Sequence, residues 1–401
     1  MAQAMSAQQQ AQMAYQQNMA ARLAVLQMAQ NMWQIISTTT VALPAYGTVF
    51  NIPIRQVGLT KRFLVEVAFT FAQSAAETQT LSKLGPANIF SNITLNDLSN
   101  YTRVNTAGWH LFMLACMKQA FFTGPAGQGK QDFQPAPSVF GTAYTNDSPI
   151  QAKAGAAVIS APTPVTVAQS GRMFFEVPVS YSDSDLRGAI YTSVVSATMY
   201  LQMTLNPNFA VGSAGDDTLA VYKSSTATDL GKINSMTITV YQNYLDQIPL
   251  GQNGPVLPAQ DISKMYLLTN GSFTGLVGGQ DFPITFPNFR AWQSLMAIYD
   301  NVGVTSYGTD VSMFQLQTAN LANIRQIDPF TQLLFQRMML KNDFTAGAYY
   351  FDFRDKPINT NQFGNMQITI RPSASTGTLF VGYEGIGIAN QVINAGSIPS
   401  N

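Results

Sequence analysis

The side chains of this chain that could do chemistry are few. His110 is the only histidine and Cys116 is the only cysteine. A Ser-His-Asp or Cys-His site would have to use His110, and closed zinc sites need several His or Cys ligands. His110 lies at the flank of an apolar helical stripe and Cys116 lies on its packed side. We therefore expect both residues to pack in a core, and we predict neither a catalytic residue nor a metal site.

Residues 124–130, GPAGQGK, have the spacing of a phosphate-binding loop up to Lys130. The next residue is Gln131, so the hydroxyl that binds magnesium in such loops is missing. The segment also follows a predicted helix, whereas a phosphate-binding loop emerges from a buried strand. We therefore predict no nucleotide binding and no cofactor.

Two carboxylates stand close together in YSDSDLRGAI, at Asp183 and Asp185. Calcium-binding loops use this spacing, but the run lacks their later glycine and glutamate. A polar turn with Arg187 as ion partner is the favoured interpretation.

A second charged group is YYFDFRDKPI, which contains Asp352, Arg354, Asp355 and Lys356 among aromatic strand residues. Nothing nearby could act as a nucleophile or a metal partner. We therefore expect an ion-pair cluster between strands or between subunits.

The composition excludes several classes of protein. Lys plus Arg is 21 and Asp plus Glu is 21, so the basic excess of a protein that neutralises nucleic-acid phosphates is absent, and we expect no direct nucleic-acid binding. Only 10% of residues are charged, against about 25% in soluble domains, whereas 46% are hydrophobic. Much of the surface is therefore expected to face other subunits. A single cysteine excludes an intrachain disulfide, and we expect neither a signal peptide nor a membrane-spanning helix.

The chain is expected to be all-β and to contain two sandwich-sized units. At 401 residues it exceeds one simple sandwich core. Residues 236–241 alternate in polarity as a half-buried strand does, and several Pro and Gly residues follow up to residue 258. We predict a helical arm over residues 1–40, a first unit over 41–245, and a second unit with a C-terminal tail over 246–401.

Strands are indicated where apolar side chains recur at every second residue, because these side chains lie on one face of a strand. Phe63, Val65, Val67, Phe69 and Phe71 occupy one face of a predicted strand. Further strands are expected at residues 93–98, 173–179, 198–205, 264–268, 282–286, 295–299, 348–353, 366–370 and 378–383.

Each unit also contains one predicted helix. In the first, Trp109, Phe112, Met113 and Cys116 form a helical stripe. In the second, Asp328 is a natural N-cap with Pro329 at the first helical position. Its apolar side is expected to consist of Phe330, Leu333, Leu334 and Met338.

The N-terminal arm has an amphipathic pattern from Met19 to about residue 36, with a wide apolar face and one charge, Arg22. Residues 1 to about 12 are expected to be mobile before assembly. Two interpretations of the helix stay open: docking under its own β unit, or contact with a lipid interface with Arg22 and Trp33 near the headgroups. The residues that we expect to lie nearest a membrane are Arg22, Leu23, Leu26, Met28, Met32 and Trp33.

Several long segments, in order along the whole chain, resemble the double jelly-roll major capsid proteins of tectiviruses, the membrane-containing icosahedral bacteriophages. These segments are GWHL at 108–111, NDSPI at 146–150, VPVSYSDSDLRGAI at 177–190, VYQNYLDQIPLGQNG at 240–254, FRDKPI at 353–358, GYE at 382–384 and NAGSI at 394–398. The resemblance implies two consecutive eight-stranded jelly rolls with an N-terminal helix and short inserted helices.

The resemblance also implies a non-enzymatic function. Such proteins form homotrimers that act as six-sided blocks and tile an icosahedral shell, with the N-terminal helix on the inner side next to the viral membrane. The implied partners are other copies of the chain, the internal lipid membrane, and minor capsid, vertex and membrane proteins of the virion. The implied location is the capsid, assembled in the host bacterial cytoplasm. A receptor- or carbohydrate-binding spike is the alternative function.

Overall fold

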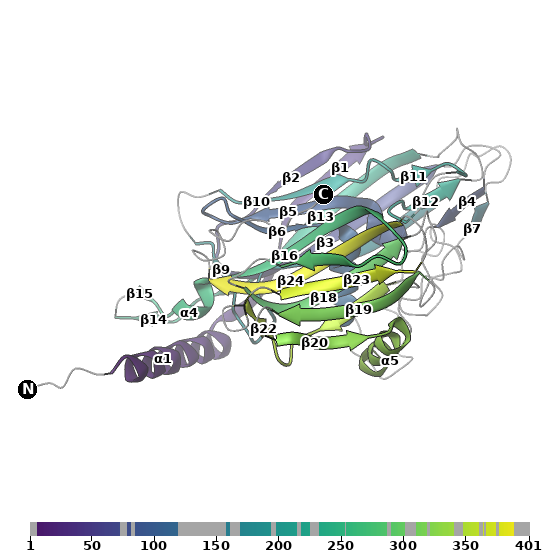
Figure 1. Cartoon of the computed structure of the whole chain (residues 1–401). Helices are drawn as coiled ribbons and strands as arrows, with labels where there is room; N and C mark the ends of the chain where they lie inside the picture. Colours follow the sequence, from purple (N-terminus) through teal and green to yellow (C-terminus); the bar gives the residue numbers. More distant parts are fainter. Residues whose placement is uncertain are drawn as a thin grey trace, which may run out of the picture.

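The computed structural model describes residues 6–72, 78–81, 85–118, 158–160, 169–193, 198–214, 218–224, 232–252, 254–286, 290–300, 310–318, 321–340, 348–360, 364, 366–373 and 377–388. Strands dominate the described part, and most of them run along one long axis of the molecule (Figure 1). The helices are α1 (Ala7–Met28), α2 (Gly108–Met117), α4 (Ala259–Ile262) and α5 (Pro329–Leu340).

The first unit contains eight longer strands in two sheets. They are β1 (Gln30–Ala42), β2 (Val49–Pro53), β3 (Leu59–Ala72), β5 (Phe90–Asn96), β6 (Thr102–Thr106), β8 (Gln169–Pro178), β10 (Tyr200–Leu205) and β13 (Lys232–Asp246). One sheet has the order β1-β13-β3-β8, and the other begins with β2-β10-β5-β6. Helix α2 lies in the connection between β6 and β8.

The second unit repeats this plan. Its strands are β16 (Lys264–Leu276), β17 (Phe282–Thr285), β18 (Arg290–Asp300), β19 (Val311–Thr318), β20 (Leu321–Ile327), β21 (Ala348–Asp352), β23 (Met366–Pro372) and β24 (Gly377–Ile388). The sheet orders are β16-β24-β18-β21 and β17-β23-β19-β20, which match the first unit strand for strand, and α5 occupies the place of α2. Two antiparallel eight-stranded rolls in one chain confirm the predicted all-β, double jelly-roll fold.

Short elements complete the chain. They are β4 (Thr78–Leu81), β7 (Val158–Ser160), β9 (Ile190–Tyr191), β11 (Ala210–Val211), β12 (Tyr222–Ser224), β14 (Leu250–Gly251), β15 (Gly254–Pro255), β22 (Ile358–Asn359) and the 3₁₀ helix η1 (Gly85–Ile89). The hairpin β14–β15 and helix α4 lie between the two rolls in sequence, where the Pro- and Gly-rich segment was noted.

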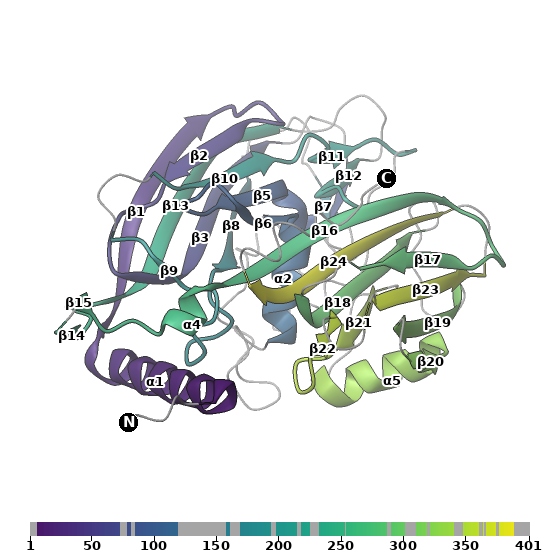
Figure 2. The ribbon, with the colours of Figure 1, turned by 60° about the vertical axis from the view of Figure 1, so that its left-hand side comes forward.

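The two rolls share a sheet. Strand β6 pairs in parallel with β16, with Leu268 opposite Val104, and this joins the two halves into one nine-stranded sheet. Helix α2 lies between the rolls (Figure 2). Its side chains Trp109, Leu111 and Met113 belong to a core that contains residues of both rolls, whereas a second core lies inside the second roll.

The arm differs from its prediction. Helix α1 begins at Ala7, where Ser6 and Gln9 form a capping box, so residues 7–12 are helical, and their predicted mobility before assembly stays a prediction. The helix ends at Met28, and residues 30–40 belong to β1, which pairs along its length with β13. The apolar residues of this segment therefore lie in a strand. Both a helix and a strand can accommodate such a short apolar run, and pairing with β13 decides between them.

Helix α5 is present as predicted, and Asp328 caps it by accepting hydrogen bonds from the backbone of Phe330 and Thr331. Its predicted apolar side is wrong, because Phe330, Leu334 and Met338 are exposed and only Leu333 is buried. The side that faces the roll carries two glutamines, Gln332 and Gln336, which are 2% and 1% exposed.

The glutamines face inward because β21 is an edge strand with free backbone groups. Gln336 accepts a hydrogen bond from the backbone amide of Tyr350 at 3.0 Å and donates to the carbonyl of Ala348 at 3.2 Å. Gln332 donates to the carbonyl of Tyr350. Buried backbone groups need such partners, so satisfying the edge outweighs burying the apolar side chains of the helix.

Candidate functional site: the junction between the rolls

Side chains from both rolls meet in a buried polar group, the central cluster, made of Lys118, Tyr181, Tyr266, Ser294 and Glu384. Glu384 on β24 is fully buried, and its carboxylate accepts from Lys118 at 2.6 Å, from the Tyr266 hydroxyl at 2.6 Å and from the Ser294 hydroxyl at 2.7 Å. The Lys118 ammonium also lies 4.8 Å from the ring centroids of Tyr181 and Tyr266. The first roll supplies the cation and the second roll supplies the anion.

The electrostatics of this cluster favour an ion pair. Burial alone would raise the pKa of Glu384, but the charge of Lys118 and the three hydrogen bonds outweigh it and hold the pKa below its usual value. A buried carboxylate with all its partners in place is tolerated, whereas loss of one partner leaves an uncompensated charge. The cluster therefore ties the second roll to the residue that follows α2.

His110 packs beside the central cluster, as predicted. It is fully buried, and its Nδ1 lies 2.7 Å from the hydroxyl of Thr106. Burial lowers the pKa of His110 to about 4, so the ring is neutral at neutral pH. The ring lies against Gly382, where an added Cβ would lie 2.3 Å from His110 Cδ2. A glycine is required here because the helix of one roll approaches the strand backbone of the other.

The Asp183 and Asp185 segment forms the predicted polar turn. Asp185 pairs with Arg187 through two contacts of 2.8 and 2.6 Å and accepts from the Arg187 backbone amide. Asp183 instead pairs with Lys61 at 3.1 Å and with Arg62. Both carboxylates therefore have cationic partners, as a structural turn requires.

The same turn contacts the second roll. The backbone amide of Gly188 donates to the carbonyl of Asp261, and Arg103 on β6 donates to the carbonyl of Gly188 at 2.8 Å. Gly188 has φ of +93°, and an added Cβ would lie 2.5 Å from the Cβ of Tyr266. The positive φ and the close approach both favour glycine.

Arg22 anchors helix α1 to the body. Its guanidinium contacts both oxygens of Asp261 on α4 at 2.6 Å, and Asn18 donates to the same carboxylate at 3.1 Å. Asp261 is 1% exposed. Arg22 is therefore engaged in an ion pair within the chain, and its predicted place near lipid headgroups stays a prediction.

The other predicted arm residues separate into two groups. Leu23 and Met28 are exposed on α1, and Leu26 packs partly against a small apolar cluster that also holds Val25 of the helix. Met32 and Trp33 lie on β1 and are also exposed. The helix therefore does not bring all six side chains together.

The remaining candidates do not form a chemical site in the described residues. Arg354 pairs with Asp352, two residues away in the same segment, at 2.6 Å, whereas the predicted cluster was between strands or subunits; Asp355 and Lys356 are exposed. Residues 124–130 with Lys130 lie outside the described residues. In the described ranges no group of three or more His, Cys, Asp or Glu side chains could hold a metal ion, and no helix there is both long and apolar enough to span a bilayer.

Sequence reasoning missed the central residues of the junction, Lys118, Tyr266 and Glu384. A signal was present for Glu384, which is the only charged residue in the run TLFVGYEGIGI. A single charge in an apolar strand predicts a buried, paired group. No signal identified its partner, because Lys118 is far away in sequence.

Comparison with known proteins gives a consistent result. The family models of the P3 major capsid protein match the chain at residues 1–248 (N-terminal) and 263–400 (C-terminal). Major capsid protein P3 of Enterobacteria phage PRD1 is 35% identical over 388 residues, covering 95% of this chain and 93% of that protein. P3 is a structural capsid protein and its family is not an enzyme family.

Solved structures share the fold at low identity. The STIV MCP has a TM-score of 0.63 at 10% identity, covering 92% of this chain and 99% of that chain. The Faustovirus major capsid protein has a TM-score of 0.52 at 9% identity, with 90% of each chain covered. The matched family models span both rolls and the arm, and the chain belongs to the P3 major capsid protein family.

Proposed function

We propose that this chain forms the shell of a virion as closed homotrimers, each a pseudo-hexagonal block that tiles an icosahedral surface around an internal lipid membrane. The observation that carries the proposal is the repeated roll: three chains supply six wedges of the same strand order. Closed three-fold symmetry requires one heterologous contact between copies, so a single interface repeated three times completes the ring.

The direction of the arm supports an inner face. Helix α1 projects beyond one end of the strand axis (Figure 1), so copies that stand side by side have all their arms on one side of the shell. Met13, Tyr15, Leu23 and Met28 are exposed on this helix. We propose that these exposed apolar side chains meet lipid, where each copy contributes a weak contact and many copies together bind the membrane.

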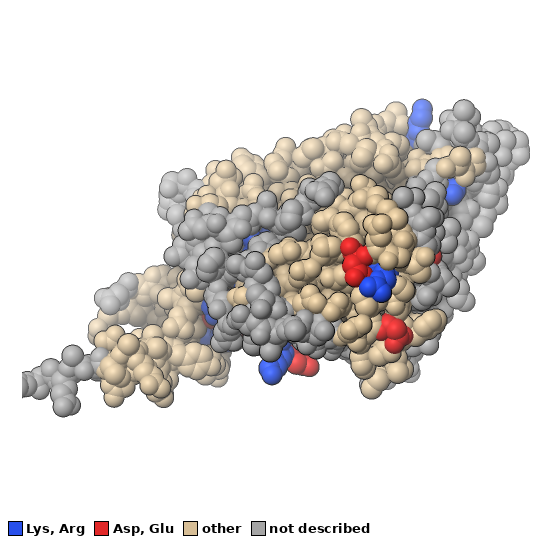
Figure 3. Space-filling view, in the orientation of Figure 1, with Lys and Arg blue, Asp and Glu red and all other residues tan. Residues whose placement is uncertain are grey.

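The surface chemistry agrees with a structural role. In the described part of the face drawn in Figure 3, most side chains are uncharged, and a few Lys, Arg, Asp and Glu side chains lie in small groups. We propose that the other partners are neighbouring trimers and the minor capsid, vertex and membrane proteins of the virion, with no direct contact to nucleic acid. We further propose that assembly takes place in the cytoplasm of the host bacterium.

The oligomeric state tests the shell function. Size-exclusion chromatography with light scattering should give about 130 kDa, which is three times the chain mass of 43.5 kDa. A monomer at micromolar concentration would contradict the proposal.

The arm is tested separately by deleting residues 1–16, which removes Met13 and Tyr15 but keeps Asn18 and Arg22 on Asp261. The truncated protein should remain trimeric and should float less with phosphatidylcholine vesicles than the full chain does. Equal flotation of the two proteins would contradict the lipid role of the arm and leave the trimer unaffected.

A further inference from the structure

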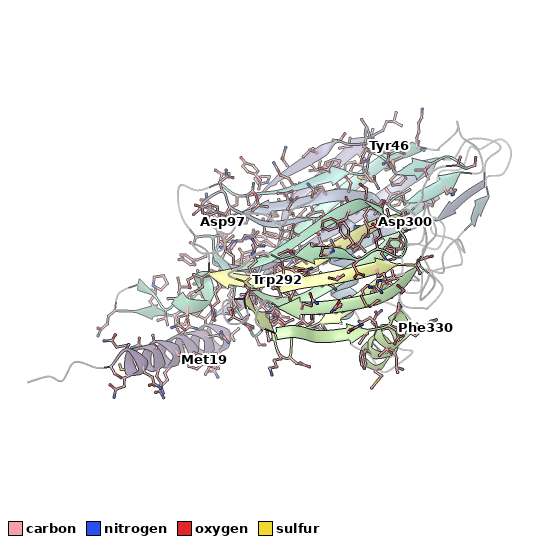
Figure 4. All side chains as sticks on the ribbon, viewed as in Figure 1. Met19, Tyr46, Asp97, Trp292, Asp300 and Phe330 are labelled. Carbon is pink, nitrogen blue, oxygen red and sulfur yellow. The ribbon has the colours of Figure 1, made fainter. Side chains whose placement is uncertain are left out.

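A cavity lined by uncharged side chains lies where the two rolls meet. Side chains pack the interior of both rolls, with Trp292 in the core of the second (Figure 4). The cavity, called here the amide cavity, has a volume of about 330 Å³. Its described lining contains four asparagines, Asn88, Asn206, Asn208 and Asn270, and no charged side chain.

The first roll supplies one wall of the amide cavity, and hydrogen bonds within the chain hold it in place. Asn88 is 3% exposed and donates to the carbonyls of Thr218 and Ala220 at 3.0 Å each. Asn206 is 4% exposed and donates to the carbonyls of Asn88 and Leu219 at 2.8 and 2.7 Å. These bonds tie three separate segments together, so this wall is preformed.

The second roll supplies the opposite wall. Ser272 on β16 and Phe380 on β24 are directly opposite each other in the sheet, so their side chains lie on the same face. Asn270 lies two residues before Ser272 and shares that face, as does Leu268, which packs in the core shared by the rolls. Asn270, Ser272 and Phe380 are half-buried. The wall is therefore the outer face of this sheet, next to the part that the first roll covers.

Polar groups of the second wall are available to a ligand. Within the described residues, no hydrogen bond engages the side chains of Asn270 and Ser272. A side-chain amide and a hydroxyl can each donate and accept a hydrogen bond. Pro207 and Asn208 of the lining are exposed, so the cavity reaches the surface of the chain.

We propose that the amide cavity binds one neutral sugar ring. The hydroxyls of a sugar both donate and accept, which matches Asn270 and Ser272, and its apolar C–H face suits the ring of Phe380. A volume of about 330 Å³ is near the lower end of small-molecule sites, about 300–1,000 Å³, and this favours a single ring. The proposal goes beyond the shell function and does not depend on it.

The absence of charge from the described lining selects against ionic ligands. A phosphorylated or acidic sugar would lose hydration in the cavity without gaining a partner of opposite charge. The ligand class is therefore a neutral hexose or N-acetylhexosamine.

A second cavity shows the contrast. It has a volume of about 280 Å³ and is lined by Arg62, Glu176, Asp183 and Lys118 among apolar residues. Arg62 pairs with Glu176 at 3.0 Å and also with Asp183, and Lys118 pairs with Glu384 at 2.6 Å. Because these charges already have partners within the chain, we assign no ligand to this cavity.

The first test is saturation-transfer NMR on the full chain with glucose, galactose and N-acetylglucosamine. At least one of these sugars should receive saturation at its ring protons and bind with a Kd in the millimolar range, as expected for a small, shallowly held ligand. Glucuronate and glucose 6-phosphate are the charged controls and should show much weaker transfer. No transfer to any of the three neutral sugars, or equal transfer to the charged ones, would overturn the proposal.

The second test locates the site with variants of the second wall. Asn270→Val places a strand-forming residue in β16 and should raise the Kd about tenfold, because a hydrogen-bonding group is lost. Ser272→Ala is the milder variant at the same wall and should raise it about threefold. Phe380→Leu keeps an apolar side chain but removes the ring, and should also raise the Kd about threefold.

The matched control is Asn92→Val, which removes a half-buried amide from β5 outside the cavity and should leave the Kd unchanged. Circular dichroism should match the parent for every variant compared. If Asn270→Val fails this check, Ser272→Ala and Phe380→Leu decide the matter. A parental Kd in the folded variants of the second wall would show that the sugar binds elsewhere and would overturn the assignment.

Discussion

The two rolls have the same strand order but differ in how their equivalent sheets are buried. Along β3 of the first roll, Phe63, Val65 and Val67 are buried and the residues between them are half-buried. Along β18 of the second roll, residues of both faces are buried, since one face packs in its own core and the other against α2. The strand order is common to both rolls. The burial of the equivalent strands differs because another part of the chain covers the outer face of the sheet in the second roll.

The difference is visible in composition. The segment 295–299, LMAIY, is a continuous apolar run, whereas 63–71 is interrupted on one face by Glu66 and Thr70. Continuous apolar strands are typical of sheets that are covered on both faces. The four predictions that follow test whether the covered face of the second roll holds the chain together, from the largest expected effect to the smallest.

The largest effect is expected for Glu384→Ala. The change removes the carboxylate that Lys118, Tyr266 and Ser294 share and leaves a cavity in a fully buried position, and we expect the free energy of unfolding to fall by about 3–5 kcal/mol. Denaturant unfolding measures it. Asp281→Ala, which breaks an exposed pair with Arg371 on the other sheet of the same roll, should change little. A similar fall in the free energy of unfolding for the two changes would show that the junction contributes no more to stability than an exposed ion pair does.

The next effect is expected for Gly382→Ala, because the new methyl group would overlap the His110 ring. Overpacking of this kind costs about 1–3 kcal/mol. Gly385→Ala on the same strand is the control, since its Cβ would lie 3.4 Å from Trp292, an ordinary contact. Thermal unfolding should show a larger loss of stability for Gly382→Ala than for Gly385→Ala. An equal loss in the two variants would mean that the cost comes from the flexibility of the strand and not from the contact between the rolls.

The pH dependence of stability should reflect His110. The unfolded ring binds a proton with a pKa of about 6.5 and the folded ring only at about 4, so the unfolded state gains protons first. Stability is therefore full above pH 6.5 and falls as the pH drops toward 4, with a slope of up to about 1.4 kcal/mol per pH unit from this group. His110→Gln should flatten the slope between pH 6.5 and 5. An unchanged slope in the variant would assign the effect to other groups.

The smallest effect on the junction between the rolls is expected for Arg22→Ala, because this change acts on the arm. Amide exchange in α1 should accelerate because the bonds to Asp261 are lost, while exchange in β18 and β24 stays the same. Gln17→Ala, at an exposed position of the same helix, should leave both regions unchanged. Faster exchange in the second roll would show that the arm supports the junction as well.

The sequence predicted the fold well and the junction poorly. Alternation identified β3, β10 and β13, and the cap at Asp328 identified the start of α5, because these signals are local. Segment 30–36 was misassigned because its apolar residues suit a helix and a strand equally, and only the distant β13 selects the strand. The side of α5 that faces the roll was predicted wrongly, because the helix sequence does not show that the edge strand β21 requires hydrogen-bond partners.

The polar residues of the junction illustrate the same limit. Asp185 and Arg187 were paired correctly because they are two residues apart. Lys118 and Glu384 are separated by more than half of the chain, and so are Arg22 and Asp261. Their spacing along the chain carries no information, and only the packing of roll on roll brings them together.

Cryo-microscopy of the assembled trimer at side-chain detail tests the central claim most directly. The account predicts three copies around one axis, with first and second rolls alternating around it and helix α1 of every copy at the same end of the block. Copies that meet across a two-fold axis, or arms at opposite ends of the assembly, would contradict it.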